Sequence, residues 1–356
     1  MARELRALGE RPRAEDGGVS WSGDARSVMR ANLWLRTATR VLVRVAKFSA
    51  TSFAELERNA KRVPWERFVG PGRAIEFAVT ARKSKLIHTT AIAERLATAA
   101  KTKTRDPRPK TQDQSSTQLF VVRVIRDEFE ISADSSGELL HMRGYRQAVG
   151  KAPIRETLAA ALLIAAEWNG DAPLIDPFCG SGTIPIEAAL IARRIAPGIN
   201  RSFALLSWPG ADLATWTDLF REARAGELPR APIAIHGSDR DKGAIASSSA
   251  NAERAGVLAD IEFTQRSVSA IAPPTGPGML ATNPPYGVRA SSKTDVRNLY
   301  AQLGNVVRSK LPGWRVALFS AQERLTAETH LTTKPLFRTT NGGIKISAVL
   351  ADATAP

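Results

Sequence analysis

The sequence has one cysteine, four histidines and no long apolar run in its 356 residues. A single cysteine excludes an internal disulfide framework. The histidines are too widely separated in the sequence to predict a metal cluster, at His88, His141, His236 and His330. The longest apolar run, residues 158–166, is too short to span a bilayer, and the N-terminus lacks the apolar core of a secretory signal. We therefore expect a cytoplasmic protein with no metal site and no membrane anchor.

Negative charge is also scarce. The chain has 50 Lys and Arg against 35 Asp and Glu, a net charge of +15, and an isoelectric point near 10.5. Residues 1–150 hold 28 basic and 17 acidic residues, a net charge of +11, whereas residues 151–356 hold 22 and 18, a net charge of +4. Such an excess favours a polyanionic partner, because a protein that neutralises phosphates releases their counterions. The alternative is a basic surface that serves only solubility.

Residues 174–189, LIDPFCGSGTIPIEAA, have the pattern of a strand, a glycine turn and a helix. Glycine at Gly180 and Gly182 allows positive φ and close approach of a ligand, and the helix start offers unpaired N–H groups. The pattern favours a nucleotide-like ligand, although an ordinary turn also fits a lone glycine pair. We interpret Cys179 as a packing residue, because no histidine lies near it in the sequence to activate a thiol.

Residues 279–289, MLATNPPYGVR, predict a short strand that stops at two prolines. Asn283 offers a side-chain carbonyl and Pro284 a backbone carbonyl at the end of this strand, where open α/β sheets bind ligands. Two acceptors on one amino group of an aromatic base would push its nitrogen toward a reactive tetrahedral form, and Tyr286 would stack on the base. The alternative is a Pro-Pro turn with an aromatic lid.

In this order and spacing, the two stretches resemble class I S-adenosylmethionine-dependent methyltransferases that methylate amino groups. Further motifs make the chain similar to the THUMP-domain RNA guanine-N2-methyltransferases from about residue 20 onward. They are RGYR at 143–146, APIRETLAAALL at 152–163, the APG-x-x-R-x-FA segment at 196–204, GSD at 237–239, TNPPYG at 282–287 and GW at 313–314. The resemblance implies an α/β, Rossmann-like class I methyltransferase fold, with a seven-stranded, doubly wound sheet and an antiparallel C-terminal hairpin. An α+β THUMP, ferredoxin-like region would precede it.

Periodicity supports this organisation. Strands are predicted at 174–176, 233–238, 261–264, 280–282 and 316–320, alternating with helical patterns, and this alternation predicts a parallel doubly wound sheet. An NGG turn between PLFRTT and IKISAVL predicts a terminal hairpin. In the front half, Ser52 and Glu55 form a capping box. Further elements are expected as a strand at 75–79, a helix at about 84–100, and strands at 120–125 and 128–132.

We expect four parts of the chain. They are a partial N-terminal ferredoxin-like region at 1–47, a THUMP RNA-binding domain at 48–127, a linker at 128–150 and the methyltransferase domain at 151–356. Proteins of the resembled family usually begin with a strand ahead of the first helix, so we expect a shortened first half-domain. Residues 101–118 predict a flexible basic loop, and residues 195–232 an insertion that the family also carries.

The resemblance implies S-adenosylmethionine as the cofactor. The implied cofactor-binding residues are Thr157, Asp176, Phe178, Gly180, Ser181, Gly182, Thr183, Asp239, Ser267 and Asn283. Asp239 suits the ribose hydroxyls; its alternative is a helix N-cap, a role for which Asp241 competes. Asp176 would order the loop or the methionyl amine. Ser267, or a backbone N–H, would replace the acidic residue that the family commonly places near the adenine.

The resemblance further implies methyl transfer to the exocyclic N2 of an unpaired guanine in ribosomal or transfer RNA. Asn283, Pro284 and Tyr286 would be the catalytic residues, in a protein expected to be a monomer. The alternatives are a DNA adenine-N6 or protein glutamine methyltransferase, and a non-catalytic RNA-binding relative. Arg143 and Arg146, in the segment between the halves, could hold phosphates or cap a helix.

Overall fold

In the computed structural model the chain divides into two compact units. Unit 1 comprises Met1–Leu140 and Arg201–Glu222, and unit 2 comprises His141–Asn200 and Ala223–Pro356. The structure describes residues 1–70, 73–103, 117–147, 154–286 and 293–352. Most of the predicted basic loop lies outside these residues. Within them, no helix is long and apolar enough to cross a bilayer.

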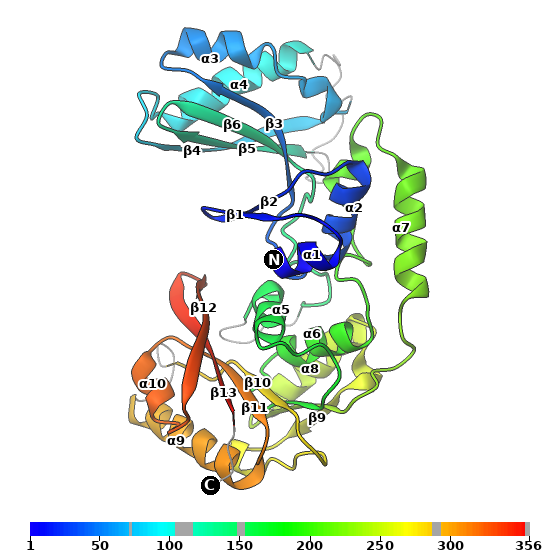
Figure 1. The fold of residues 1–356 in the computed structure, drawn as a ribbon, viewed down its shortest axis with the longest axis vertical. Helices are drawn as coiled ribbons and strands as arrows, with labels where there is room; N and C mark the ends of the chain where they lie inside the picture. Colours follow the sequence, from blue (N-terminus) through cyan, green and yellow to red (C-terminus); the bar gives the residue numbers. More distant parts are fainter. Residues whose placement is uncertain (71–72, 104–116, 148–153, 287–292, 353–356) are drawn as a thin grey trace. The chain divides into compact units, whose positions relative to one another are not determined.

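Unit 1 contains a four-stranded sheet of order β3-β6-β5-β4, in which β4 and β5 are parallel and the other pairs antiparallel. Its elements are β3 (Leu42–Ser49), α3 (Phe53–Ala60), β4 (Ala74–Arg82), α4 (Thr89–Lys103), β5 (Thr117–Ile125) and β6 (Glu128–Asp134). The two helices cover one face of the sheet (Figure 1). Phe120, Val122 and Val124 alternate toward this covered face and are fully buried. The expected strands of the front half are therefore present.

Helix starts in unit 1 follow local hydrogen bonds. The Ser52 side chain accepts from the Glu55 backbone N–H at 3.3 Å, as the capping box predicts. Helix α4 begins at Thr89, five residues later than expected. The reason is a turn before it, in which Lys83 adopts a left-handed φ of 51° and the Ser84 hydroxyl bonds the backbone of Arg82 and Asp127. Serine competes with the helix by such local bonds.

The boundaries of the front half differ from the expected ones. Residues 1–41 add α1 (Ala2–Ala7), α2 (Ala25–Trp34) and a small hairpin, β1 (Arg13–Glu15) with β2 (Gly18–Ser20), to the same unit. The sequence did not predict the hairpin. Strand β6 occupies an interior position of the sheet, so the expected linker at 128–150 begins inside the sheet.

The middle of the expected insertion belongs to unit 1. Trp208 packs edge-on against Phe68, with ring centroids 5.0 Å apart, and its indole N–H donates to Gln118 at 2.7 Å. This segment contains η3 (Ala204–Ser207) and most of α7 (Leu213–Ala225). Its aromatic contacts explain why residues 201–222 separate from the unit 2 sequence on either side of them.

Unit 2 is a seven-stranded sheet of order β12-β13-β11-β10-β7-β8-β9. Its strands are β7 (Leu174–Asp176), β8 (Ile235–Asp239), β9 (Glu262–Gln265), β10 (Met279–Thr282), β11 (Arg315–Ser320), β12 (Thr333–Asn341) and β13 (Ile344–Asp352). Its main helices are α5 (Glu156–Ala165), α6 (Thr183–Ala192), α8 (Lys242–Arg254), α9 (Lys293–Lys310) and α10 (Glu323–Ala327). Strands β7 to β11 are parallel, and β13 is antiparallel to both β11 and β12. The predicted doubly wound sheet and terminal hairpin are confirmed.

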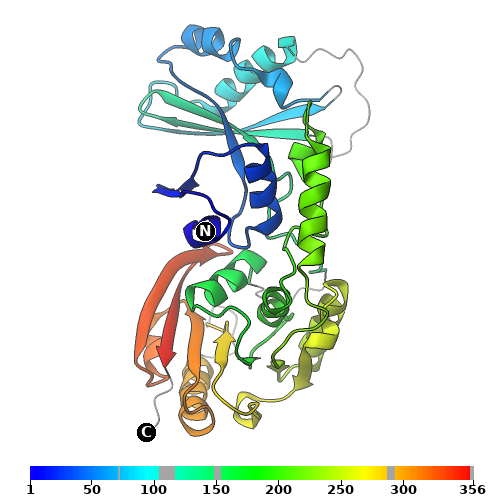
Figure 2. The ribbon, with the colours of Figure 1, turned by 45° about the vertical axis from the view of Figure 1, so that its right-hand side comes forward.

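The chain reverses its direction along this sheet between β7 and β10. From β7 it proceeds to β8 and β9 on one side, and from β10 to β11 on the other. Right-handed crossovers therefore place α6 and α8 on one face and α9 on the other (Figure 2). In open α/β sheets, ligands bind beyond the carboxyl ends of the strands at such a reversal.

The division into units changes the interpretation of charge. Unit 1 holds 28 basic and 20 acidic residues, a net charge of +8, and unit 2 holds 22 and 15, a net charge of +7. The excess that seemed to belong to the front half is nearly equal in the two units, because residues 141–150 are basic and residues 201–222 are slightly acidic. Charge alone therefore does not favour unit 1 as the polyanion-binding part.

Candidate functional site

Four parallel strands of unit 2 bring their carboxyl ends to one edge. Strands β10, β7, β8 and β9 are consecutive neighbours in the sheet. Asp176 ends β7, Asp239 ends β8 and Thr282 ends β10. Asn283 follows β10, and Ser267 follows β9 after one intervening residue. The topology thus assembles polar residues from distant parts of the sequence at the edge where a ligand is expected.

The glycine loop between β7 and α6 has the backbone that its sequence predicts. Gly180 and Gly182 have φ of 56° and 81°, in the left-handed region that favours glycine. A Cβ at Gly182 would lie 3.1 Å from Ser248 Cβ, whereas a Cβ at Gly180 would meet no atom within 4 Å. Gly182 is therefore needed for packing against α8, and Gly180 leaves open space beside the loop.

Two side chains of helix α8 hold the glycine loop by hydrogen bonds to its backbone. The Ser248 hydroxyl donates to the Gly180 carbonyl at 2.8 Å, and the Asn251 amide donates to the Ser181 carbonyl at 2.9 Å. Both side chains are fully buried. Sequence reasoning missed them, although the small polar run SSSAN, with polar residues three positions apart, was a usable signal. Cys179 is buried, its sulfur lies 3.6 Å from the Ser248 oxygen, and burial raises the pKa of its thiol, as a packing residue requires.

Asp176 is buried and hydrogen-bonded at the base of the loop. Its Oδ1 accepts from the Phe178 backbone N–H at 3.1 Å and from the Thr282 hydroxyl at 2.6 Å. Burial raises the pKa of Asp176 to about 7, an effect that the negative charge of Asp239 increases and the two hydrogen bonds oppose. The expectation that Asp176 orders the loop agrees with these contacts.

Asp239 faces the same loop from the end of β8. Its Oδ2 accepts from the Gly180 N–H at 3.1 Å, and its Oδ1 accepts from the Asp241 N–H at 3.0 Å. Asp241, not Asp239, is the N-cap of α8, since its carboxylate accepts from Gly243 N–H at 2.9 Å. The two candidates for the cap are therefore separated, and Asp239 remains available to a ligand because a carboxylate accepts more than two bonds.

The structure also places three further residues that were predicted to bind the cofactor. Thr157 is buried at the second position of α5, which packs against α6, and Thr183 is the first residue of α6. The Ser267 hydroxyl lies 2.9 Å from that of Ser269 on an exposed turn after β9. Their roles stay predictions.

The lip after β10, residues 283–286, carries an acceptor without a partner. Asn283 Oδ1 is buried and makes no hydrogen bond with any described residue. Leaving a buried carbonyl unpaired is costly, so a donor from outside the chain is the expected partner. Pro284 is buried and Pro285 exposed. The Tyr286 side chain is only 7% exposed, so stacking on a base would require one face of this ring to be uncovered.

The arginines of the RGYR segment make ion pairs and hydrogen bonds within unit 2. Arg143 and Tyr145 are buried, and both reach Glu187 Oε1 in α6, at 3.5 Å from Arg143 Nε and 3.1 Å from the tyrosine hydroxyl. Arg146 pairs with Glu156 at 3.2 Å and donates to the Ile154 carbonyl. These contacts stabilise the helix behind the glycine loop. An acidic residue inside the apolar helix of residues 183–192 was the signal that a buried cation is nearby.

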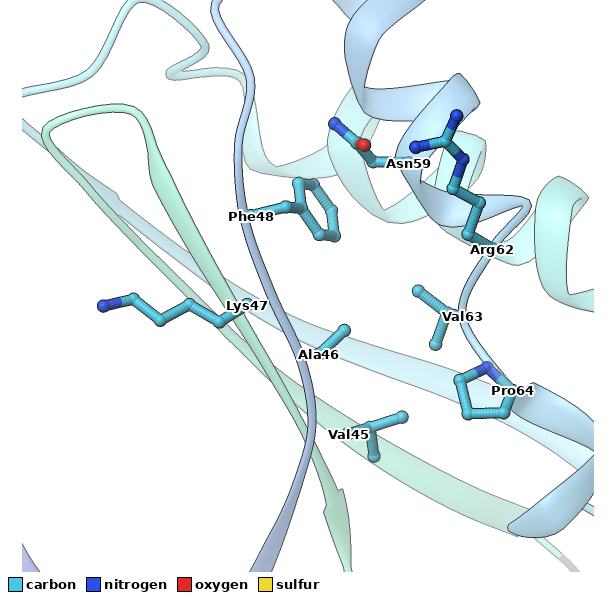
Figure 3. A pocket seen from close by; sticks show the side chains of 8 residues that line it. All are labelled: Val45, Ala46, Lys47, Phe48, Asn59, Arg62, Val63 and Pro64. Carbon is cyan, nitrogen blue, oxygen red and sulfur yellow. The ribbon is translucent and has the colours of Figure 1, made fainter.

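A separate hollow lies in unit 1, between β3 and the end of α3 (Figure 3). Its volume is about 260 Å³. It is lined by Val45, Ala46, Lys47, Phe48, Asn59, Arg62, Val63 and Pro64. Strand β3 is at the edge of its sheet, and its pairing with β6 shifts register between Arg44 and Ala46. Within the described part of the chain, no group of three His, Cys, Asp or Glu side chains could hold a metal ion.

Comparisons with known proteins match one family model to most of unit 2 and another to the start of unit 1. The family described as RMKL-like, methyltransferase domain, matches residues 143–348, and the RlmL ferredoxin-like domain matches residues 1–42. A putative RNA methyltransferase of Synechocystis sp. is 34% identical over 96% of this chain and 91% of its own length. A putative RNA methyltransferase of Bacillus subtilis is 36% identical over 91% and 85%.

Longer proteins and solved structures also match. The ribosomal RNA large subunit methyltransferase K/L of Syntrophotalea carbinolica is 36% identical, and this chain spans 50% of its length. A crystal structure from Listeria monocytogenes, described as a predicted N6-adenine-specific DNA methylase, aligns with a TM-score of 0.88 and 34% identity, covering 100% of this chain and 92% of that one. A putative methyltransferase solved with SAH aligns with a TM-score of 0.88 and 29% identity, covering 100% and 94%.

Proposed function

Because the chain belongs to the RMKL-like methyltransferase family, we propose that it transfers a methyl group from S-adenosylmethionine to the exocyclic N2 amine of a guanine in RNA. The observation that carries this proposal is the buried Asn283 Oδ1 after β10, for which the described residues offer no hydrogen-bond partner. It lies at the end of the strand that neighbours the glycine loop's strand. The named RNA methyltransferases among the relatives support RNA as the substrate class.

The residues at the edge of the sheet fit the cofactor. Gly180 leaves open space where a Cβ would project, and the start of α6 directs backbone N–H groups toward the loop. Asp239, at the end of β8, is in the position from which a carboxylate binds ribose hydroxyls in dinucleotide folds. Phe178, Ser181 and Thr183 would complete the cradle. S-adenosylmethionine, when bound, supplies an electrophilic methyl group on a sulfonium.

The lip then acts on the amine. Asn283 Oδ1 and the Pro284 carbonyl would accept the two protons of the amino group, which moves its nitrogen toward a tetrahedral geometry and frees its lone pair. Holding the amine in line with the methyl group supplies much of the remaining acceleration. The two carbonyls only accept hydrogen bonds, and no strong base is required, because the methylated nitrogen would be positively charged and acidic and would release its extra proton to water. The base must be unpaired to enter this site.

Unit 1 would bind parts of the RNA other than the base that is methylated. This assignment relies on the position of its α+β sheet, which corresponds to a THUMP module in the resembled family, and on its net charge of +8. Since unit 2 is nearly as basic, we expect both units to contact phosphates.

An adenine-N6 activity on DNA is the strongest competitor, since the same lip suits that amine and the Listeria relative is described in those terms. The decisive experiment incubates the protein and Asn283→Ala with labelled cofactor and, separately, total transfer RNA, deproteinised ribosomal RNA and duplex DNA. We expect label in one RNA, mapped to guanine N2, and none with the variant. Label found only on DNA adenine would show that the adenine-N6 activity is the correct one. Absence of label in every nucleic acid would refute the proposal.

A further inference from the structure

Two residues separated by 106 positions in the sequence share one buried hydrogen bond. The Thr282 hydroxyl donates to Asp176 Oδ1 at 2.6 Å, and the side chains are 0% and 1% exposed. Thr282 directly precedes the lip, and Asp176 directly precedes the glycine loop. The bond therefore joins the two segments to which the proposed function assigns different tasks.

The backbone does not make this connection. Strands β7 and β10 pair only at Leu174 with Met279 and at Ile175 with Leu280. Beyond these pairs, Thr282 is paired with β11, at Leu318. Asp176 Oδ1 also accepts from the Phe178 N–H at 3.1 Å, inside the loop. A single carboxylate oxygen thus holds both the loop and the residue before the lip, where the ladder between their strands has ended.

We propose that Thr282 is a positioning residue. Its hydroxyl, through Asp176, would fix the lip relative to the glycine loop. This inference rests on the proposed function for its catalytic consequence, but its structural part does not. A hydrogen bond to a carboxylate has a defined length and direction, so it transmits position better than apolar contact does. Without it, the lip is held on this side only by strand packing, and the target amine would sit less accurately against the methyl group.

The same hydrogen bond affects the ionisation of Asp176. The pKa of this carboxyl is raised to about 7, mainly by burial and also by the Asp239 charge, while the Thr282 and Phe178 bonds act to lower it. The groups that face it are therefore Asp239 and the buried Cys179 thiol, whose own pKa Asp176 raises. Removing the hydroxyl should raise the pKa of Asp176 again. Because the carboxyl is then more costly to ionise in the folded state, the added destabilisation should grow as pH rises through 7.

The first test uses the unliganded full chain. Thr282→Val removes the hydroxyl at similar size, and Thr282→Ser keeps it. We expect the melting temperature of the valine variant to fall further below that of the serine variant at about pH 8.5 than at about pH 6. Thr329→Val is the matched control, because it removes another fully buried hydroxyl of unit 2, one that bonds the Thr326 carbonyl. The control should show no such dependence on pH, and a gap between the Thr282 variants that stays constant with pH would overturn the assignment.

The second test measures kcat and the affinity for SAH. Thr282→Val should lower kcat by about tenfold or more while the dissociation constant for SAH stays within about threefold, and Thr282→Ser should recover most of the rate. A valine variant with the wild-type kcat, or one that loses rate and SAH affinity in parallel with Thr329→Val, would contradict a positioning role. If the wild type methylates no RNA, the proposed function fails, and the melting experiment still decides whether Thr282 and Asp176 are coupled.

Discussion

The two sheets differ in what lies at the ends of their strands. In unit 1, the turns after β4 and β5 bond to each other through Ser84 and Asp127, and their cations face solvent. Both units have a buried carboxylate at a strand end: Asp134 in β6 pairs with Arg40, and Asp176 in β7 accepts from Thr282. In unit 2, Asn283 Oδ1 beyond β10 also has no partner among the described residues. The units have similar net charges, so charge indicates only the class of partner. The Asn283 oxygen, at the same sheet edge as the glycine loop, is what points to a reaction.

The largest expected effect is at the lip. Asn283→Ala removes the unpartnered acceptor, so methyl transfer should fall by about a hundredfold or more. The affinity for SAH should stay within a few fold, because the glycine loop is unchanged. Single-turnover assays and calorimetric titration with SAH measure the two quantities. Equal losses in both would mean that Asn283 mainly supports the cofactor site.

The glycine loop allows a sharper comparison between two neighbouring residues. Gly182→Ala introduces a Cβ 3.1 Å from Ser248, in a left-handed conformation, so it should reduce the unfolding free energy by about 1–3 kcal/mol. Gly180→Ala meets no protein atom, so it should cost only the penalty of a left-handed backbone, about 1–2 kcal/mol, yet it should lower SAH affinity at least as much as Gly182→Ala does. Denaturant unfolding and SAH titration of both variants test this. A Gly180→Ala protein with wild-type SAH affinity would exclude close approach of the cofactor to that residue.

The contribution of an ion pair in unit 2 to the unfolding free energy should depend on how deeply the pair is buried. Glu187→Gln removes the buried carboxylate that pairs with Arg143 and should reduce the unfolding free energy by about 3 kcal/mol. Glu328→Gln breaks a more exposed pair with Arg297, and should cost less than about 1 kcal/mol. Urea unfolding of the two variants makes the comparison. Similar losses would show that the RGYR segment does not depend on its buried charges.

The smallest effect is expected in unit 1. Arg62 is exposed at the rim of the hollow, whereas Arg95 in the same unit is paired with Glu57. If unit 1 binds RNA phosphates around the hollow, Arg62→Ala should weaken RNA binding a few fold and reduce the salt dependence of log K by about one. Arg95→Ala should change it less. RNA-binding curves at several salt concentrations measure both quantities. Wild-type affinity and salt dependence in both variants would contradict this interpretation.

Much of the fold was predictable, because strand alternation, the glycine turn, the Asn-Pro-Pro sequence and the NGG hairpin are local signals. The boundaries in unit 1 were not predictable in this way. Trp208 holds residues 201–222 on the rest of unit 1 through contacts with Phe68 and Gln118, which are distant in sequence. Periodicity in a short window cannot report such a contact.

The candidate site was predicted as a set of residues but not as a connected structure. Asp176, Asp239 and Asn283 were found because each follows a predicted strand. The hydrogen bonds that join these residues to Thr282 and to the loop depend on which strands are neighbours. The order of strands in a sheet cannot be predicted from any single segment of the sequence. The buried support from Ser248 and Asn251 depends on the packing of α8 under the loop, and it was missed for the same reason.

The most direct test is a structure of the complex with SAH and an RNA fragment that contains the target base. The account predicts the guanine N2 within hydrogen-bonding distance, about 2.7–3.2 Å, of both Asn283 Oδ1 and the Pro284 carbonyl. The SAH sulfur should face that nitrogen from one side of the base plane, the side to which the lone pair of a tetrahedral amine points. A lip turned away from the sulfur, or Asn283 Oδ1 bonded instead to a group of the protein itself, would contradict the central claim.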